Sequence, residues 1–148
     1  LLFLVLLFFI YKMTKKLDFT KYADFVDGVT SHPSNDYQCF IESVSALNGK
    51  GANIERLLTA AVGISAEGGE FMEIVKKMVF QGKPWDEHNR KHLIIELGDV
   101  MWYVMQACMA LDVSLDEVVE GNVDKLKKRY PGGEFNVYQS ENRKEGDL

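Results

Sequence analysis

Apolar positions along most of this chain repeat with the spacing of an α-helix. Over residues 18–29 they share one helical face, which is formed by Phe19, Tyr22, Phe25, Val26 and Val29. The same spacing predicts a short helix over residues 37–47 and long helices over 54–80 and 89–111. No useful stretch alternates between apolar and polar residues as a half-buried strand would. The pattern therefore predicts an all-α fold.

Helix breakers and caps indicate where these helices begin and end. The segment "QGKPWDEHN" separates the two long helices, since Gly82 and Pro84 together do not continue a helix. We expect "SHPSND" to be a loop. Ser114 and Glu117 form a capping box that starts a last helix, and "PGG" ends it after Arg129 or Tyr130. We expect a four-to-five-helix bundle with antiparallel core helices.

The second half of the 89–111 helix is apolar nearly all round from Val100 onward. A helix of this kind is usually central and packed on several sides. One small bundle does not easily cover so much apolar surface. We therefore expect the chain to be oligomeric.

The N-terminal run "LLFLVLLFFIY" is shorter than the roughly 20 apolar residues that span a bilayer. It has neither the basic start nor the small-residue cleavage site of a signal peptide. We expect Met13 to be the natural start and residues 1–12 to be an apolar extension that is not native, with a truncated membrane anchor as the alternative. The remaining chain then divides into one all-α domain over 13–135 and a polar, flexible tail over 136–148.

Composition restricts the class of partner. The 148 residues are 47% hydrophobic and 26% charged, with a net charge of −5 and no Lys/Arg-rich run, so neither a nucleic-acid nor a membrane partner is expected. An anionic ligand would need locally placed cations, because the overall field repels it. Cys39 and Cys108 have no zinc spacing and predict no disulfide framework, which favours a cytoplasmic protein.

Two pairs of acids share a spacing that places both members on one helical face. Glu67 and Glu70 form the first pair, and Glu96 and Asp99 form the second. Either pair alone is typical of a solvated surface. Two such pairs on neighbouring antiparallel helices can converge, and four converging carboxylates require cations. Hard oxygen ligands favour Mg²⁺ or Mn²⁺.

A di-iron centre is the competing interpretation, because helical bundles hold such sites with Glu residues and Glu-x-x-His pairs. No Glu-x-x-His occurs in this chain. His88 and His92 have a spacing that would allow metal binding, but near a helix start we expect them to be solvated.

Gly68 and Gly69 stand between Glu67 and Glu70 inside a helix, where each glycine costs about 1 kcal/mol relative to alanine. We expect the missing side chains to allow close approach of a neighbouring helix or of bound phosphates.

The last helix carries a basic face. Asn122, Lys125 and Arg129 lie on one side of it, with Tyr130 adjacent. Taken alone, such a face is usually a solvated helix end that complements the helix dipole. Beside a Mg²⁺-binding face, its cations could hold phosphate oxygens, with Arg129 binding in a forked manner. The combination favours hydrolysis of a phosphoanhydride.

These motifs resemble a known family. "EGGE" followed by "ELGD" resembles the E-x-x-E…E-x-x-D signature of the MazG-like, all-α nucleoside triphosphate pyrophosphohydrolases, and "NVDKLKKRYPGGEF" is similar to the segment that follows in many members. The likeness covers about residues 54–135. It implies hydrolysis of nucleoside or deoxynucleoside triphosphates to a monophosphate and pyrophosphate. It also implies a homodimer or homotetramer.

The resemblance further implies roles for individual residues. Glu67, Glu70, Glu96 and Asp99 would bind Mg²⁺, while Asn122, Lys125, Arg129 and Tyr130 would contact phosphates or nucleotide. We expect in-line attack of water on the α-phosphorus, with Glu70 as the candidate general base. Lys83 is a candidate phosphate contact, and Trp85 either stacks on the base or anchors its loop.

Two alternatives stay open at this point. The first is a sibling activity on the same fold, namely dUTP- or dCTP-preferring hydrolysis or hydrolysis of phosphoribosyl-ATP. The second is a non-catalytic helical interaction protein whose acids lie on the surface.

Overall fold

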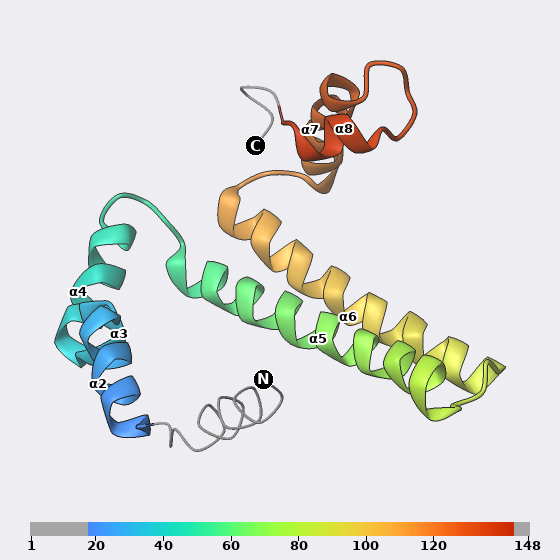
Figure 1. Ribbon diagram of the computed structural model, residues 1–148. Coiled ribbons are helices and arrows are strands. Elements are labelled where there is room, and N and C mark those ends of the chain that lie inside the picture. Colours follow the sequence, from blue (N-terminus) through green and yellow to red (C-terminus); the bar gives the residue numbers. More distant parts are fainter. Residues whose placement is uncertain (1–17, 144–148) are drawn as a thin grey trace, which may run out of the picture. The chain divides into compact units, whose positions relative to one another are not determined.

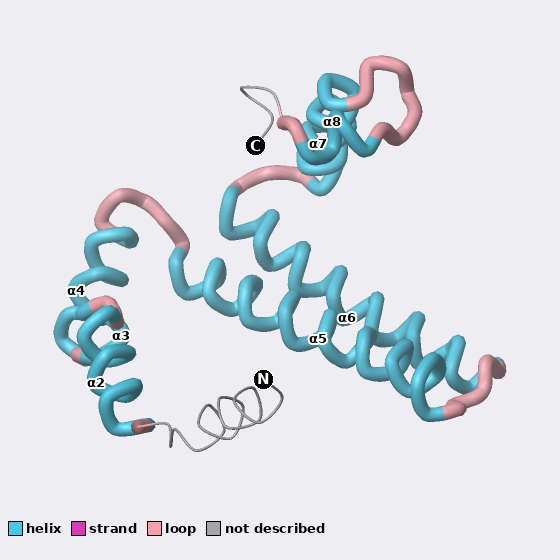
Figure 2. Tube along the Cα trace, in the orientation of Figure 1, coloured by secondary structure: helices cyan, strands magenta, loops and turns pink. Residues whose placement is uncertain are grey.

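The computed structural model describes residues 18–143, and every regular element in that range is a helix (Figures 1 and 2). The helices are α2 (Phe19–Val29), α3 (His32–Asn35), α4 (Tyr37–Asn48), α5 (Ile54–Gln81), α6 (Glu87–Leu111), α7 (Leu115–Arg129) and α8 (Val137–Glu141). The all-α prediction is confirmed. The predicted extension over 1–12 and the last residues of the predicted tail, 144–148, lie outside the described residues.

The chain divides into two compact units, with the boundary between Ala46 and Leu47. In the first unit, Asp18 caps α2 by accepting a hydrogen bond from the Lys21 amide. The "SHPSND" segment is not a simple loop, because it contains the short helix α3. Proline is tolerated in the first turn of a helix, where its missing N–H has no helical partner to lose. The predicted division into a 13–135 domain and a tail stays a prediction.

The second unit is built on α5 and α6, which pack along each other as an antiparallel pair (Figure 1). Asn53 caps the start of α5 and Asp86 caps the start of α6. Gly82 ends α5 with a φ of 70°, a left-handed conformation that favours glycine. The short connection over 82–86 then reverses the chain, so the acid pairs predicted for the two helices lie on neighbouring elements.

The core of the α5–α6 pair is small and contains polar groups. Its buried apolar side chains are Ala60, Ile74 and Cys108. Asn89 is also buried, and its amide Nδ2 donates a 2.8 Å hydrogen bond to the Pro84 carbonyl, which ties the interhelical connection to α6. The fifth buried side chain is the carboxylate of Glu96.

The closest approach of the two helices is at Gly63, where a β-carbon would overlap the ring of Tyr103. Gly68 and Gly69 are different, because a β-carbon at either position would meet no atom within 4 Å. The expected close approach at Gly68 and Gly69 is therefore wrong for contacts within the described chain. It occurs one to two turns earlier on α5.

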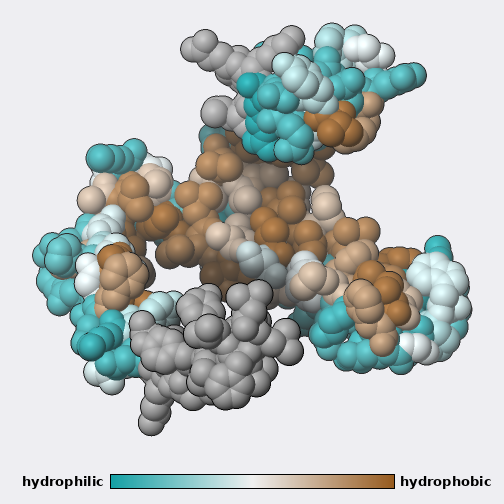
Figure 3. All heavy atoms as spheres, viewed as in Figure 1, coloured by the Kyte–Doolittle hydropathy of each residue, from teal (hydrophilic) through white to brown (hydrophobic). Residues whose placement is uncertain are grey.

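The apolar second half of α6 is not packed on several sides within residues 18–143, contrary to our expectation. Met101, Met105 and Met109 are 41%, 44% and 59% exposed. Figure 3 shows hydrophobic residues gathered along the α5–α6 pair. By length and composition alone α6 could cross a membrane, but this is weak evidence, because the core helix of a soluble protein passes the same test.

The C-terminal helices confirm one predicted cap and add one helix. Ser114 and Glu117 form the capping box at the start of α7, with hydrogen bonds of 3.1 Å and 2.7 Å in the two directions. α7 packs against α6 much less extensively than α5 does. The short helix α8 lies inside the segment that was predicted as a polar tail, and Asn136 caps its start.

Candidate metal centre

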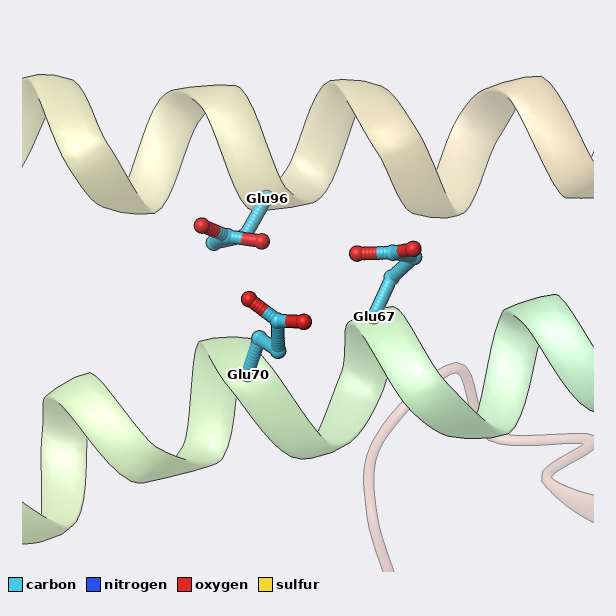
Figure 4. A group of neighbouring side chains, drawn as sticks. All are labelled: Glu67, Glu70 and Glu96. Carbon is cyan, nitrogen blue, oxygen red and sulfur yellow. The ribbon is translucent and has the colours of Figure 1, made fainter.

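Three carboxylates from two helices point toward one another in the α5–α6 pair (Figure 4). Glu67 and Glu70 come from α5, and Glu96 comes from α6. Each offers one oxygen, and these oxygens all lie within 4.8 Å of one another. The spacing of three residues places Glu67 and Glu70 on the face of α5 that meets α6. We call these three residues the glutamate cluster.

The glutamate cluster is partly withdrawn from water. Glu96 is only 5% exposed, Glu67 is half-buried and Glu70 is exposed. Among residues 18–143, no Lys or Arg side chain forms an ion pair with any of the three. Burial of a carboxylate is costly unless a cation or hydrogen-bond donors compensate it. The cluster is therefore an electrostatically unfavourable arrangement that a bound cation would relieve.

The pKa of Glu67 is raised by this environment. Desolvation by burial raises it above the usual value, and the negative charges of Glu70, Asp99 and Glu96 raise it further, in that order. Both causes disfavour the ionised form of Glu67. A positive charge placed among these carboxylates would act in the opposite direction.

The donor set suits a hard divalent cation. Mg²⁺ binds oxygen ligands at about 2.0–2.1 Å, so two ligands of one ion lie at most about 4.2 Å apart. The oxygens of the glutamate cluster, within 4.8 Å, need only small side-chain rotations to reach that spacing. A site that offers carboxylates, with neither sulfur ligands nor several imidazoles, favours Mg²⁺ or Mn²⁺ over softer metals. The residues therefore fit the ion that was predicted.

Asp99 does not belong to the cluster, although the sequence predicted four converging acids. It lies on α6 three residues after Glu96, and it is exposed. Its charge nevertheless contributes to the raised pKa of Glu67. The structure thus brings three of the four predicted ligands together and leaves Asp99 beside them. Its role as a metal ligand stays a prediction.

His92 contacts the cluster, which the sequence interpretation missed. Its Nε2 lies 2.9 Å from Oε1 of Glu96, so this side chain is not simply solvated as expected. The signal was present in the sequence, since the two residues are four apart on one helix. The pair His88–His92, whose spacing would allow metal binding, is not part of the cluster. His88 is exposed.

The predicted substrate contacts on α7 lie on a separate helix. α6 ends at Leu111, fifteen residues beyond Glu96, and α7 begins at Leu115. At 1.5 Å per residue, the end of α6 is therefore about 22 Å along the helix from Glu96. Lys125 and Arg129 are half-buried and Asn122 is exposed. The glutamate cluster does not include any of them, and their roles stay predictions.

Tyr130 ends α7 and packs against a residue that the sequence analysis did not single out. Its ring centre lies 5.9 Å from that of Phe135. Both rings line a largely apolar cavity of about 290 Å³, together with Val123, Leu126, Lys127, Gly133 and Glu134. The "PGG" turn makes this return possible, because Gly133 adopts a φ of 74°.

Lys83 and Trp85 lie in the connection between α5 and α6, at the opposite end of α6 from α7. Gln81, the last residue of α5, is about 16 Å along the helix from Glu70. Trp85 is 70% exposed and Lys83 is half-buried. The structure does not bring either side chain into the glutamate cluster, so both substrate roles stay predictions.

Comparison with known proteins gives one family. Residues 56–133 match the MazG nucleotide pyrophosphohydrolase domain. The chain is also similar to the Gene 37 protein of Mycobacterium phage L5, with 41% identity over 83 residues, which are 55% of this chain and 72% of that protein. No solved structure matches. The matched range contains the glutamate cluster, Asp99, His92 and all of α7.

Proposed function

Because this chain belongs to the MazG nucleotide pyrophosphohydrolase family, we propose that it hydrolyses nucleoside or deoxynucleoside triphosphates to a monophosphate and pyrophosphate with Mg²⁺ or Mn²⁺. The glutamate cluster is the observation that carries this proposal. Three carboxylates from two helices meet within 4.8 Å, and no described Lys or Arg pairs with them. Acids that serve only as solvated surface groups would not include a glutamate buried at the helix–helix contact, as Glu96 is.

The cluster residues would hold the cation, with Asp99 completing the set from α6. A divalent cation held there would supply positive charge to neutralise the triphosphate and would activate water for attack on the α-phosphorus. Buried Glu96 suits a fixed ligand, because its side chain has little freedom. Glu70 is the most exposed of the three and is therefore best placed to accept a proton from the attacking water.

Cations and aromatic groups outside the cluster would hold the rest of the nucleotide. We propose Asn122, Lys125, Arg129 and Tyr130 on α7 as phosphate or nucleotide contacts, with Lys83 and Trp85 as further candidates. Trp85 is 70% exposed, which supports a stacking role because most of its surface is accessible to a ligand. The residues of α7 would reach the cluster if α7 folds back along α6, or from another copy of the chain.

We also propose that the chain works as a homodimer or homotetramer. The support is the uncovered apolar surface of α6, which includes Met101, Met105 and Met109. Continuous exposed apolar surface on a soluble protein marks an interface. A cytoplasmic location accords with this assignment, while nucleic-acid and membrane partners have no support.

Product identification tests the proposed reaction. The protein is incubated with each common nucleoside triphosphate, dUTP, dCTP and phosphoribosyl-ATP in the presence of Mg²⁺ or Mn²⁺. A monophosphate plus pyrophosphate is expected, and the ranking of rates identifies the preferred base and sugar. Orthophosphate plus a diphosphate contradicts the proposed bond cleavage. Absence of turnover with every nucleotide and both metals favours a non-catalytic helical interaction protein.

A further inference from the structure

His92 lies within ion-pair distance of Glu96 at the edge of the glutamate cluster. Its Nε2 lies 2.9 Å from Oε1 of Glu96, and the Glu96 side chain is 7% exposed while that of His92 is 44% exposed. An ionised carboxylate only accepts hydrogen bonds, so a hydrogen bond between these two atoms requires a proton on Nε2 of the imidazole. The proposed reaction assigns no role to this contact.

Glu96 is the single member of the cluster that α6 supplies. The orientation of its carboxylate therefore decides whether ligands from the two helices meet at one point. A glutamate side chain has several rotatable bonds, and a close polar partner at one oxygen restricts its rotation. The second oxygen, and the remaining lone pair of Oε1, stay free to accept other partners. The His92 contact thus restricts Glu96 without consuming its capacity as a ligand.

We propose that His92 is a positioning residue, whose Nε2–H holds the Glu96 carboxylate in the orientation that meets Glu67 and Glu70 around one divalent cation. This inference depends on the proposed metal site. Hydrogen-bond partners of metal ligands commonly contribute 10–100-fold to metal affinity, because they fix ligand rotation before the metal arrives. The spacing of four residues keeps the donor in place as long as α6 is helical.

Mn²⁺ binding to the full chain tests the role without relying on turnover. Free Mn²⁺ is measured by electron paramagnetic resonance at one fixed neutral pH for the wild type, His92→Leu, His92→Gln and His88→Leu. His92→Leu removes the donor and should weaken Mn²⁺ affinity by about 10–100-fold. His92→Gln retains an N–H donor near Glu96 and should recover most of the affinity. His88→Leu is the matched control at an exposed histidine one turn earlier, and it should bind as the wild type does.

The outcomes separate this inference from the metal site itself. If the wild type binds no Mn²⁺, both proposals are overturned. If the wild type binds and His92→Leu binds equally well, the metal site stands and the role of His92 is wrong. If His92→Gln and His92→Leu weaken Mn²⁺ binding equally, the proposed role of His92 is also wrong, because the N–H donor would then make no difference. Metal-free thermal unfolding verifies that each variant is folded, and alanine replaces leucine at the same position in a variant that is not.

Discussion

The ring of Tyr103 on α6 lies against the backbone of Gly63 on α5, so that a β-carbon at Gly63 would overlap the ring. The ring of Tyr103 is also in a T-shaped contact with that of Trp102, with ring centres 4.8 Å apart. The contact between Gly63 and Tyr103 fixes how closely the two helices approach. It lies one turn from Glu67, and therefore helps to set the separation across which the glutamate cluster forms.

Gly63→Ala should destabilise the fold despite the better helix propensity of alanine. Overpacking of a tight contact costs about 1–3 kcal/mol, whereas the gain in propensity is about 1 kcal/mol. Gly68→Ala is the matched control, since nothing lies within 4 Å of its β-carbon position. It should leave the chain as stable as the wild type or more stable by up to about 1 kcal/mol. Urea unfolding of the two variants measures the difference, and equal effects would contradict the contact.

Gly68→Ala also tests what covers the open face of α5. A variant that gains stability but loses turnover or self-association would show that bound phosphates or another copy approach Gly68. If the variant keeps both its turnover and its self-association, neither bound phosphates nor another copy requires a glycine at position 68.

Glu70→Gln should raise the thermal midpoint of the metal-free chain, because it removes one of three like charges within 4.8 Å. For a largely exposed carboxylate the gain is at most about 1 kcal/mol. The same change should reduce the stabilisation that Mg²⁺ gives to the wild type and should abolish turnover. Differential scanning calorimetry with and without Mg²⁺ measures both effects, and Glu120→Gln on α7 is the control. Full activity in Glu70→Gln would show that the cluster is not the metal site.

Glu67 and Glu73 should make stability depend on pH in opposite directions. The folded-state pKa of Glu67 is raised by burial and by neighbouring carboxylates, so the folded chain holds this proton more tightly than the unfolded chain. Its contribution is fully present below about pH 4.5 and is lost as pH rises through the raised pKa. The pKa of Glu73 is lowered to about 2 by hydrogen bonds from Lys76 and Lys77, so its contribution is present above 4.5 and lost as pH falls toward 2.

Unfolding of the metal-free wild type, Glu67→Gln and Glu73→Gln across this pH range separates the two effects. The advantage of Glu67→Gln over the wild type should grow with rising pH. The disadvantage of Glu73→Gln should shrink as pH falls below 4.5. A pH dependence of the same sign in both variants would contradict the assigned causes.

Met105→Glu should reduce self-association. Met105 lies on the apolar part of α6 and is 44% exposed, so the change places a charge on the proposed interface. Analytical ultracentrifugation should give the wild type a mass well above the 16.8 kDa of one chain, and the variant should shift toward that value. Lys91→Glu, at an exposed position nearer the start of α6, is the control. A monomeric wild type would refute the proposed assembly.

The long helices and several of their ends were predictable from the sequence, because they depend on local signals. Apolar periodicity located α5 and α6, and the Ser114–Glu117 capping box fixed the start of α7. The short helix α3 was not predicted, because the polar segment "SHPSND" is typical of a loop, although its proline is compatible with a first helical turn.

Contacts between helices were harder to predict. The spacing of the acids indicated a cluster, yet the sequence did not show that Asp99 would lie outside it, since this depends on the rotation of α6 about its axis. The contact between Gly63 and Tyr103 depends on the register of α5 against α6, which one sequence does not reveal. The proximity of His92 to Glu96 is local, and helical spacing alone was sufficient to find it.

Hydrolysis in ¹⁸O-labelled water tests the central claim most directly. The wild type is incubated with Mg²⁺ and its preferred nucleoside triphosphate, and the products are analysed by mass spectrometry beside those of Glu96→Gln. Attack on the α-phosphorus predicts one ¹⁸O in the monophosphate, unlabelled pyrophosphate, and no turnover in the variant. Label in pyrophosphate or orthophosphate, or an unchanged rate in Glu96→Gln, would contradict a pyrophosphohydrolase that acts through the glutamate cluster.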